Sequence, residues 1–360
     1  MASANSRLDS GLDRFRRRDG VESEGDRRRA PAMTSRYLHA WTIRRPDEGF
    51  RMTKRLIDTT ARELATYGRE EVVASIRGSE GRVLAAEVIA PAMAAVHDVS
   101  NPEVAAAMGA DLIVLNLLDV RSPAVQAIEV ADAADVVREV KRLTGRLVAV
   151  NLEPVDPHAD RVTDDQFGPG GTSGRLATPE NVAAAVALGV DAVVLTGNPG
   201  MGVTNDSLAR AVGATREAAG PDVVVMAGRM HAAGSASQAG SRIVDERSLE
   251  AFVAAGADVV LLPAPGTVPG CHETQVRGWV ETVHGAGALT MTTIGTSQEG
   301  ADEDTIRRIA LMAKMTGTDV HHLGDCGLFG IALPENLLAY SIAIRGRRHT
   351  YRRMAMSLLR

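Results

Sequence analysis

The sequence predicts a single closed (β/α)8 barrel, an α/β fold, and three observations carry this prediction. From Arg82 onward, a short apolar run followed by a helical pattern recurs about every 35 residues. The runs have the length of strands, are rich in β-branched residues and are apolar throughout, which indicates parallel strands buried on both faces. Eight such units in one chain favour a closed barrel over an open doubly wound sheet.

The eight predicted strands lie at residues 83–90, 112–117, 147–152, 192–196, 223–227, 259–262, 289–294 and 320–323. Between them are alanine-rich amphipathic stretches such as 181–188 and 249–255. Several of these end in Gly-Ala-Asp or a close variant, where Gly109, Gly189 and Gly256 supply a left-handed helix stop before the next strand. A helix over 53–77 is predicted to precede the first strand and to plug the N-terminal end of the barrel.

The two ends of the chain differ from the barrel in composition. Residues 1–51 hold 12 Arg against 8 acidic residues and show almost no apolar periodicity, so we expect a disordered extension before a barrel domain over 52–360. An alternative is that the natural start is Met52. The arginines near the C-terminus are interpreted as a solvated face or a subunit contact, and they are Arg345, Arg347, Arg348, Arg352 and Arg353.

Composition narrows the function classes. No apolar run reaches the roughly 18 residues that a membrane span requires, so no membrane association is expected. The net charge of −5 argues against a nucleic-acid partner. Two Cys among 360 residues offer no disulfide framework, which favours a cytoplasmic protein. We expect a small-molecule substrate and a homo-oligomer.

Barrels of this kind carry their active sites at the C-terminal ends of the strands, and the first three strands place polar residues there. Glu87 lies within the first strand, Asn116 ends the second, and Asn151 and Glu153 follow each other on one side of the third. Layers inside such barrels take side chains from alternate strands, so Glu87 and Glu153 are expected to share one. Paired carboxylates suit acid/base catalysis or a divalent cation.

The next loops are predicted to bind the substrate. The longest loop, 155–178, has the length and glycine content of a lid. Gly197 and Asn198 open a glycine-rich segment that leads into a helix, where backbone amides are able to approach a phosphate. After the fifth strand, Arg229 is a candidate anion clamp, and His231 is a candidate acid/base group or simply a loop histidine.

The last two strands complete the candidate site. Thr293 and Gly295 end the seventh strand, and Gly324 and Gly327 follow the eighth, where phosphate sites of this fold frequently lie. Alternation from Val320 turns His322 inward. Because the first and eighth strands are neighbours in a closed barrel, His322 is expected beside Glu87. Asp325 is placed to orient this histidine or to bind a cation.

The scarcity of lysine excludes one mechanism. The chain contains only three, Lys54, Lys141 and Lys314, and each falls in a predicted helix rather than at a strand end. A Schiff base is therefore not expected. Neither pyridoxal phosphate nor a nicotinamide cofactor is predicted. A divalent cation, Mg²⁺ or Mn²⁺, is the expected cofactor, with Glu87, Glu153 and His322 as its ligands.

Three segments resemble an uncharacterised bacterial TIM-barrel family that carries the labels phosphoenolpyruvate phosphonomutase-like or haloacid dehalogenase-like hydrolase. They are Asn151-Leu152-Glu153-Pro154, the run 196–200, and His322-Leu323-Gly324-Asp325. The resemblance extends over about 52–360 and implies a fold more than an activity. The Asp-x-Asp-x-Thr motif of the dehalogenases is missing from Leu118-Asp119-Val120-Arg121, and the Asp-Gly loop pattern of the phosphonomutases is missing too.

These observations predict an enzyme of the lyase or isomerase type. It would act on a small phosphorylated or carboxylated metabolite, similar to a sugar phosphate, by metal-assisted or general acid/base chemistry. A hydrolase that uses the same groups to activate water is one alternative. A barrel that binds a sugar phosphate without turnover is the other. Convergence of Glu87, Glu153 and His322 would favour catalysis.

Overall fold

The computed structural model describes residues 53–156, 174–197, 202–231, 243–327 and 329–360. The extension predicted over 1–51, Asn198, and most of the predicted lid lie outside these residues. The division of the chain near Met52 therefore stays a prediction.

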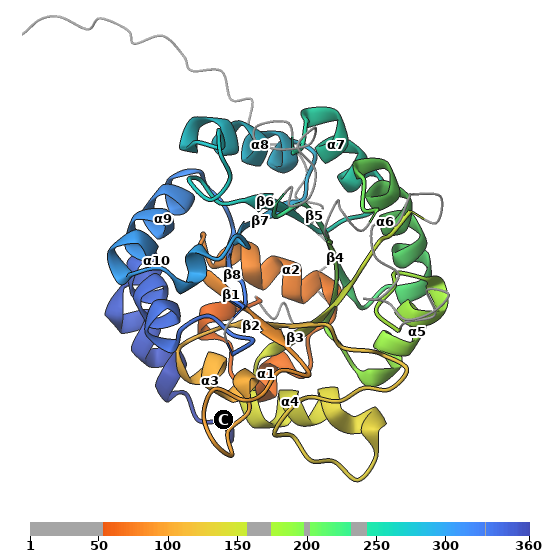
Figure 1. Cartoon of the computed structure of the whole chain (residues 1–360), viewed down its shortest axis with the longest axis vertical. Coiled ribbons are helices and arrows are strands. Elements are labelled where there is room, and N and C mark those ends of the chain that lie inside the picture. The colour runs from red at the N-terminus through yellow and green to blue at the C-terminus, as the bar shows by residue number, and fades with distance from the viewer. Residues whose placement is uncertain (1–52, 157–173, 198–201, 232–242, 328) are drawn as a thin grey trace, which may run out of the picture. The chain divides into compact units, whose positions relative to one another are not determined.

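Eight parallel strands close into a barrel in chain order, which confirms the predicted (β/α)8 fold (Figure 1). They are β1 (Val83–Ile89), β2 (Leu112–Asn116), β3 (Leu147–Leu152), β4 (Ala192–Leu195), β5 (Val224–Gly228), β6 (Val259–Pro263), β7 (Leu289–Ile294) and β8 (Val320–Leu323). Closure is made by β1 and β8, which pair in parallel over four residues each, from Val83 opposite Val320 to Ala86 opposite Leu323.

Helices surround the sheet (Figure 1). They are α3 (Asn101–Ala107), α4 (Val136–Thr144), α5 (Pro179–Leu188), α6 (Asn205–Ala219), α7 (Glu246–Ala254), α8 (Glu273–Gly285), α9 (Glu303–Met315) and α10 (Pro334–Ala355), with short 3-10 turns η2 (Ala133–Asp135) and η8 (Gln298–Gly300). Gly189 ends α5 in the left-handed conformation, as its place in the sequence predicted. None of the described helices is long and apolar enough to cross a membrane.

The segment before β1 corrects one prediction, because three short elements replace the single helix expected over 53–77. They are η1 (Leu56–Asp58), α1 (Ala61–Leu64) and α2 (Arg69–Gly78). Thr60 caps the start of a new helix, α1. Its side chain accepts from the backbone N–H of Glu63, and the Glu63 carboxylate accepts from the backbone N–H of Thr60. The plug itself is present: Val72 and Ile76 of α2 belong to the same core as the inward residues of the barrel.

The interior of the barrel changes from apolar to polar toward its C-terminal end. Small aliphatic side chains fill the lower layers, and Ala85, Val114 and Ala149 are among them. Two residues further along β1, β2 and β3, the inward positions become Glu87, Asn116 and Asn151. A separate and larger apolar core lies between the sheet and the outer helices. The polar layer is therefore supported from below and around by packed hydrocarbon.

A repeated aspartate fixes the opposite end of the barrel. Asp111, Asp191, Asp258 and Asp319 stand just before β2, β4, β6 and β8. Each carboxylate accepts from a backbone N–H of the preceding strand, at 2.8 to 2.9 Å. Each also pairs with a basic side chain: Arg345 and Arg353, Lys141, Arg69 and Arg216, and His284 respectively. We call these four residues the aspartate latches.

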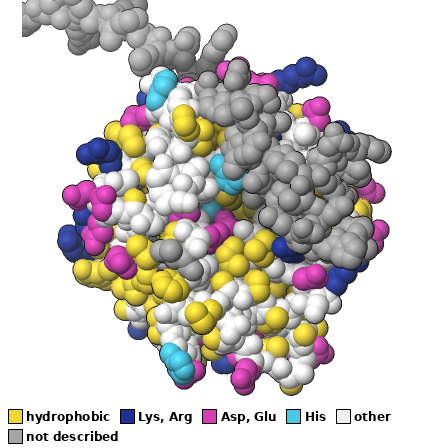
Figure 2. Space-filling model, viewed as in Figure 1, with side chains coloured by type: hydrophobic (Ala, Val, Ile, Leu, Met, Phe, Trp, Pro, Cys, Tyr) yellow, Lys and Arg dark blue, Asp and Glu magenta, His cyan; other side chains and the backbone are white. Residues whose placement is uncertain are grey.

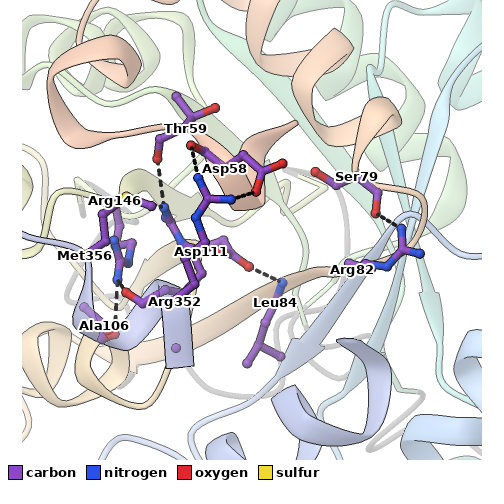
Figure 3. Close-up of polar contacts among 12 residues, drawn as sticks. Asp58, Thr59, Ser79, Arg82, Leu84, Ala106, Asp111, Arg146, Arg352 and Met356 are labelled. Atoms are coloured by element: carbon purple, nitrogen blue, oxygen red, sulfur yellow. Dashed lines mark hydrogen bonds and ion pairs between the residues drawn. The ribbon is translucent and has the colours of Figure 1, made fainter. Parts of the chain in front are cut away.

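The latch at Asp111 also fastens the C-terminal helix. Figure 3 shows Asp111 where it accepts from the backbone of Leu84. Asp111 accepts from the backbone of Leu84, and its ion pairs with Arg345 and Arg353 hold α10 beneath β1 and β2. Arg146 donates to the backbone oxygen of Arg353 at 2.8 Å. Two of the arginines interpreted as a solvated face or subunit contact, Arg345 and Arg353, are thus buried structural groups.

We expect the substitution Asp258→Ala to lower the free energy of unfolding by about 3 kcal/mol, because it leaves the N–H of Val225 and the guanidinium groups of Arg69 and Arg216 without their shared acceptor. Urea denaturation followed by circular dichroism measures this loss. Asp304→Ala is the matched control: its side chain is 92% exposed, and its pair with Arg307 should contribute less than about 0.5 kcal/mol. Equal losses in the two variants would contradict the latch.

Candidate active site

A cavity of about 200 Å³ lies at the C-terminal ends of β1 to β5. Acidic and histidine side chains gather at the centre of the face that Figure 2 shows. The cavity is lined by Glu87, Asn116, Leu117, Asn151, Glu153, Thr196, Gly197, Met230 and His231. Six of the predicted site residues are among them: Glu87, Asn116, Asn151, Glu153, Gly197 and His231.

Glu87 is the centre of a hydrogen-bond chain that crosses three strands. Asn116 Nδ2 donates to Glu87 Oε1 at 2.6 Å, and Asn151 Nδ2 donates to Asn116 Oδ1 at 3.1 Å. Asn116 Oδ1 also accepts from the backbone N–H of Leu117, a residue with φ of 56°. A leucine in the left-handed region is uncommon, and such backbone strain concentrates at functional sites. The chain of amides fixes the carboxylate of Glu87 at the cavity wall.

His322 lies against Glu87, on the inward side of β8. Its Nε2 is 3.1 Å from Glu87 Oε2, and the ring is fully buried. The alignment of this pair falls short of a hydrogen bond, and Nδ1 makes none with the described residues. His321 points the other way: its Nδ1 lies 3.1 Å from the hydroxyl of Tyr340, on α10. Strand alternation therefore separates an inward from an outward histidine.

Glu87 and Asp325 form a carboxyl pair. Burial by itself raises the pKa of Glu87, but His322, Asn116 and a hydrogen bond to Asp325 together bring this pKa below its ordinary value. The pKa of Asp325 moves the opposite way, raised by burial and by the negative charge of Glu87. Glu87 is therefore the carboxyl of the pair that ionises first, and it faces the cavity.

Glu299 extends this acidic cluster, although it was not among the site residues predicted from the sequence. It is buried in η8, after β7, and Oε1 accepts from the backbone N–H of Cys326 at 3.1 Å. Oε2 makes no hydrogen bond with the described residues. Burial raises the pKa of Glu299, and the charge of Asp325 raises it further. The sequence offers one signal for Glu299, which is a carboxylate in the loop after the seventh strand. A prediction limited to the residues at the strand ends does not include this position.

Glu153 is a buried carboxyl with no partner among the described residues. Only 7% of the residue is exposed, and its side chain makes no hydrogen bond or ion pair with them. Burial raises the pKa of Glu153 to about 7, against a smaller lowering by Arg175. A Cβ on Gly197 would come within 3.7 Å of Glu153 Oε2 and 2.9 Å of Val203, so a glycine is required there. The absent side chain leaves room beside this carboxyl.

The remaining predicted residues of β5 and its loop lie in different surroundings. His231 lines the cavity, and burial lowers its pKa, so its ring is neutral at pH 7. Arg229 is not a lining residue: its Nη1 donates to Asn205 Oδ1 at 3.1 Å, at the start of α6. Burial lowers the pKa of Arg229 to about 10.

The predicted phosphate loops after β7 and β8 lie beside the acidic cluster. Thr293 Oγ1 donates to the backbone oxygen of Leu262 at 3.0 Å. A Cβ on Gly324 would come within 2.8 Å of the backbone oxygen of Ile294, and one on Gly295 within 3.2 Å of Met230. Gly327 has φ of 67° and donates to Asp325 Oδ1 at 2.8 Å. Close packing therefore explains the glycines at 295 and 324, and turn geometry explains the glycine at 327.

The predicted metal ligands do not form a three-residue set. Within the described ranges, no group of three or more His, Cys, Asp or Glu side chains is arranged to hold a metal ion. Glu87 and His322 are adjacent, whereas Glu153 lies elsewhere on the cavity wall. The expected Mg²⁺ or Mn²⁺ site with these three ligands therefore does not fit the described geometry, and we assign no chemical step to a cation.

The fold and the polar cavity define a (β/α)8 barrel with an acidic site at its C-terminal mouth. Residues 57–360 match the family described as Domain of unknown function (DUF7916), and the chain belongs to that family. No curated protein matches the chain. The description of this family names no activity, so the evidence for an activity comes from the site itself.

Several solved structures are similar in fold. One is 2,3-dimethylmalate lyase, a PEP mutase/isocitrate lyase superfamily member, with 15% identity, coverage of 74% of this chain and 81% of that one, and a TM-score of 0.44. An archaeal fructose 1,6-bisphosphate aldolase is 14% identical over 74% and 94%, with a TM-score of 0.46. Thiamine phosphate pyrophosphorylase from Pyrococcus furiosus is 15% identical over 74% and 96%, with a TM-score of 0.41. The haloacid dehalogenase-like label finds no support in these comparisons.

Stability should depend on pH through Glu153. Its folded-state pKa of about 7 lies above the ordinary 4.5, so the folded chain keeps this proton to higher pH than the unfolded chain. The contribution to stability is therefore lost as the pH rises from 4.5 through about 7. We expect Glu153→Gln to be more stable than the natural protein by up to about 3 kcal/mol at pH 8, and nearly equal at pH 4.5.

Urea denaturation at a series of pH values measures this gap. Glu281→Gln is the control, because its side chain is 65% exposed. Its difference from the natural protein should stay flat with pH. A Glu153→Gln difference that is equally flat would show that Glu153 titrates in the ordinary range.

Proposed function

We propose that the protein is an enzyme of the lyase or isomerase type that moves protons on a small polar metabolite at the mouth of the barrel. The observation that carries the proposal is the carboxylate of Glu87, which accepts from Asn116 at 2.6 Å, pairs with Asp325 and lies 3.1 Å from the buried ring of His322. A carboxylate that is ionised, fixed by hydrogen bonds and open to a cavity is suited to act as a general base.

The chemistry follows from the placement of these groups. Glu87 accepts a proton from a carbon beside a carbonyl group of the substrate, and the C–H electron pair moves toward the carbonyl oxygen as an enolate forms. Glu87 then returns the proton in one of two ways. In an isomerisation, a hydroxyl group on the deprotonated carbon gives its proton to the enolate oxygen, and Glu87 protonates the former carbonyl carbon. In a lyase reaction, the enolate electron pair forms a C=C bond as the bond to a leaving group on the β carbon breaks, and Glu87 protonates that leaving group. Asp325 is hydrogen-bonded to Glu87 and holds its carboxylate in place.

The surroundings favour catalysis over simple binding. Burying two carboxyl groups and a histidine in contact is costly, and a protein that only binds a ligand has no need for this arrangement. Non-glycine residues with positive φ also flank the site: Leu117 after β2, Ser297 after β7 and Cys326 after β8, at 56°, 72° and 51°. Such strain is found where a backbone is held for function.

The charge of the cavity wall restricts where the anionic group expected on the substrate binds. Among the described residues that line the cavity there is neither Lys nor Arg, so we place a phosphate or carboxylate of the substrate outside it, in the glycine-rich loops after β7 and β8. The absence of lysine at the strand ends still argues against a Schiff base.

Hydrogen exchange into a panel of compounds tests the proposal whichever substrate the enzyme takes. The protein is incubated in D2O with small hydroxy, keto and amino compounds, and loss of C–H signals is followed by NMR. Glu87→Gln should lower the exchange rate by about 10² to 10⁴, because the amide does not accept the proton. Glu281→Gln, at an exposed position of α8, should leave the rate unchanged.

The role of Asp325 makes a second prediction. The amide of Asp325→Asn still donates a hydrogen bond to Glu87, whereas Asp325→Ala does not, so we expect the Asn variant to exchange at least about tenfold faster than the Ala variant. The same NMR assay measures both rates. Equal rates in the two variants would show that Asp325 does not act through a donated hydrogen bond. Binding of a compound with no exchange of any kind would favour the non-catalytic barrel.

A further inference from the structure

Resting on the proposed function, we propose that the substrate carries a primary amine and that its ammonium group binds in the cavity against Glu153. This site is separate from the acid/base pair, because Glu153 lies after a different strand and has no role in the proton transfer derived above. Three properties of the cavity support it: the charge of its wall, the isolation of Glu153 and the shape of the space beside that residue.

The charge of the cavity wall is negative. Glu87 is ionised, His231 is neutral at pH 7, and the other described lining residues except Glu153 carry no charge. Like charges repel strongly where water is excluded, so a phosphate or carboxylate in this space would be opposed by Glu87. An ammonium group would be attracted instead. Charge complementarity therefore selects a cation among small organic ligands.

Glu153 is the lining group that lacks a counterion among the described residues. It is more than nine-tenths buried, it lines the cavity, and its carboxyl makes no contact with a described donor. Arg175 lowers the pKa of Glu153 through its opposite charge, and this effect is smaller than that of burial. A buried carboxylate is normally paired, and an isolated one costs several kcal/mol. A ligand with an N–H donor and a positive charge would supply the missing partner.

The shape of the space supports a small ligand. At roughly 30 Å³ for each water, the cavity of about 200 Å³ holds about seven, which is the scale of a short amino alcohol or amino sugar fragment. Gly197 leaves the side of Glu153 open, since no side chain of its own reaches toward the carboxyl. The amides of Asn116 and Asn151 also line the wall and offer partners for hydroxyl groups.

A matched set of ligands tests the inference. Serinol (2-amino-1,3-propanediol) and glycerol differ only by an amino group in place of a hydroxyl. We expect calorimetric titration at pH 8 to show that serinol binds at least about tenfold more tightly than glycerol, because the ion pair forms only with the amine. Serinol should also bind about tenfold more tightly at pH 8 than at pH 6, since Glu153 ionises near pH 7.

Variants separate Glu153 from the rest of the site. Glu153→Gln should lose at least about tenfold in affinity for serinol and should lose the pH dependence, whereas Glu281→Gln should retain both. The folded state of each variant is checked by its thermal transition. Binding of glycerol as tight as that of serinol, no detectable binding of serinol by the natural protein, or unchanged serinol binding in Glu153→Gln would each overturn the inference.

The failure of this inference is distinguishable from failure of the proposed function. Glu87-dependent hydrogen exchange on compounds without an amine would retain the enzyme and remove the ammonium site. Glu153-dependent binding of serinol with no exchange on any compound would retain the ammonium site and remove the enzyme.

Discussion

The aspartate latches are the constraint on which the rest of the barrel depends. Each joins the backbone of one strand to the start of the next, and Asp111 illustrates the arrangement: its N–H donates to Leu84 O while its carboxylate accepts from Leu84 N–H. Two bonds between the same pair of residues leave a single register for the two strands. Because register sets which side chains reach the C-terminal end, the latches at the bottom of the barrel determine the positions of the site residues at its top.

The site obtains its chemistry from the change of polarity inside the barrel. Below it, Ala85 and Val114 fill the interior with hydrocarbon, so the carboxyl groups above are taken out of water. The consequence differs for the two cavity carboxylates. Glu87 is surrounded by donors and stays ionised, whereas Glu153 has none among the described residues and holds its proton to about pH 7. Two residues of one type thus acquire different properties from their neighbours alone.

The sequence was sufficient for the strands and for the pairing of Glu87 with His322. Continuous β-branched runs predicted burial on both faces, and closure of eight strands made the first and last neighbours. The same reasoning failed where three-dimensional packing decides. The apolar periodicity did not reveal the break that Thr60 and Glu63 make before α1. It also did not reveal the bend of α10 at Gly346, after which Arg353 pairs with Asp111. The direction of Arg229 toward Asn205 and the burial of Glu299 likewise depend on contacts between distant loops.

The alternation of the latches has a consequence for how the barrel comes apart. Their carboxylates cross the boundaries from β1 to β2, β3 to β4, β5 to β6, and β7 to β8. At three of the boundaries between, only the backbone oxygens of Asp111, Asp191 and Asp258 accept from the next strand in the described chain. Counted by these carboxylate bonds, the barrel consists of four two-strand modules, each closed by its own aspartate. Local opening is expected at the seams between modules, and these seams are the natural places to divide the chain into fragments that reassemble.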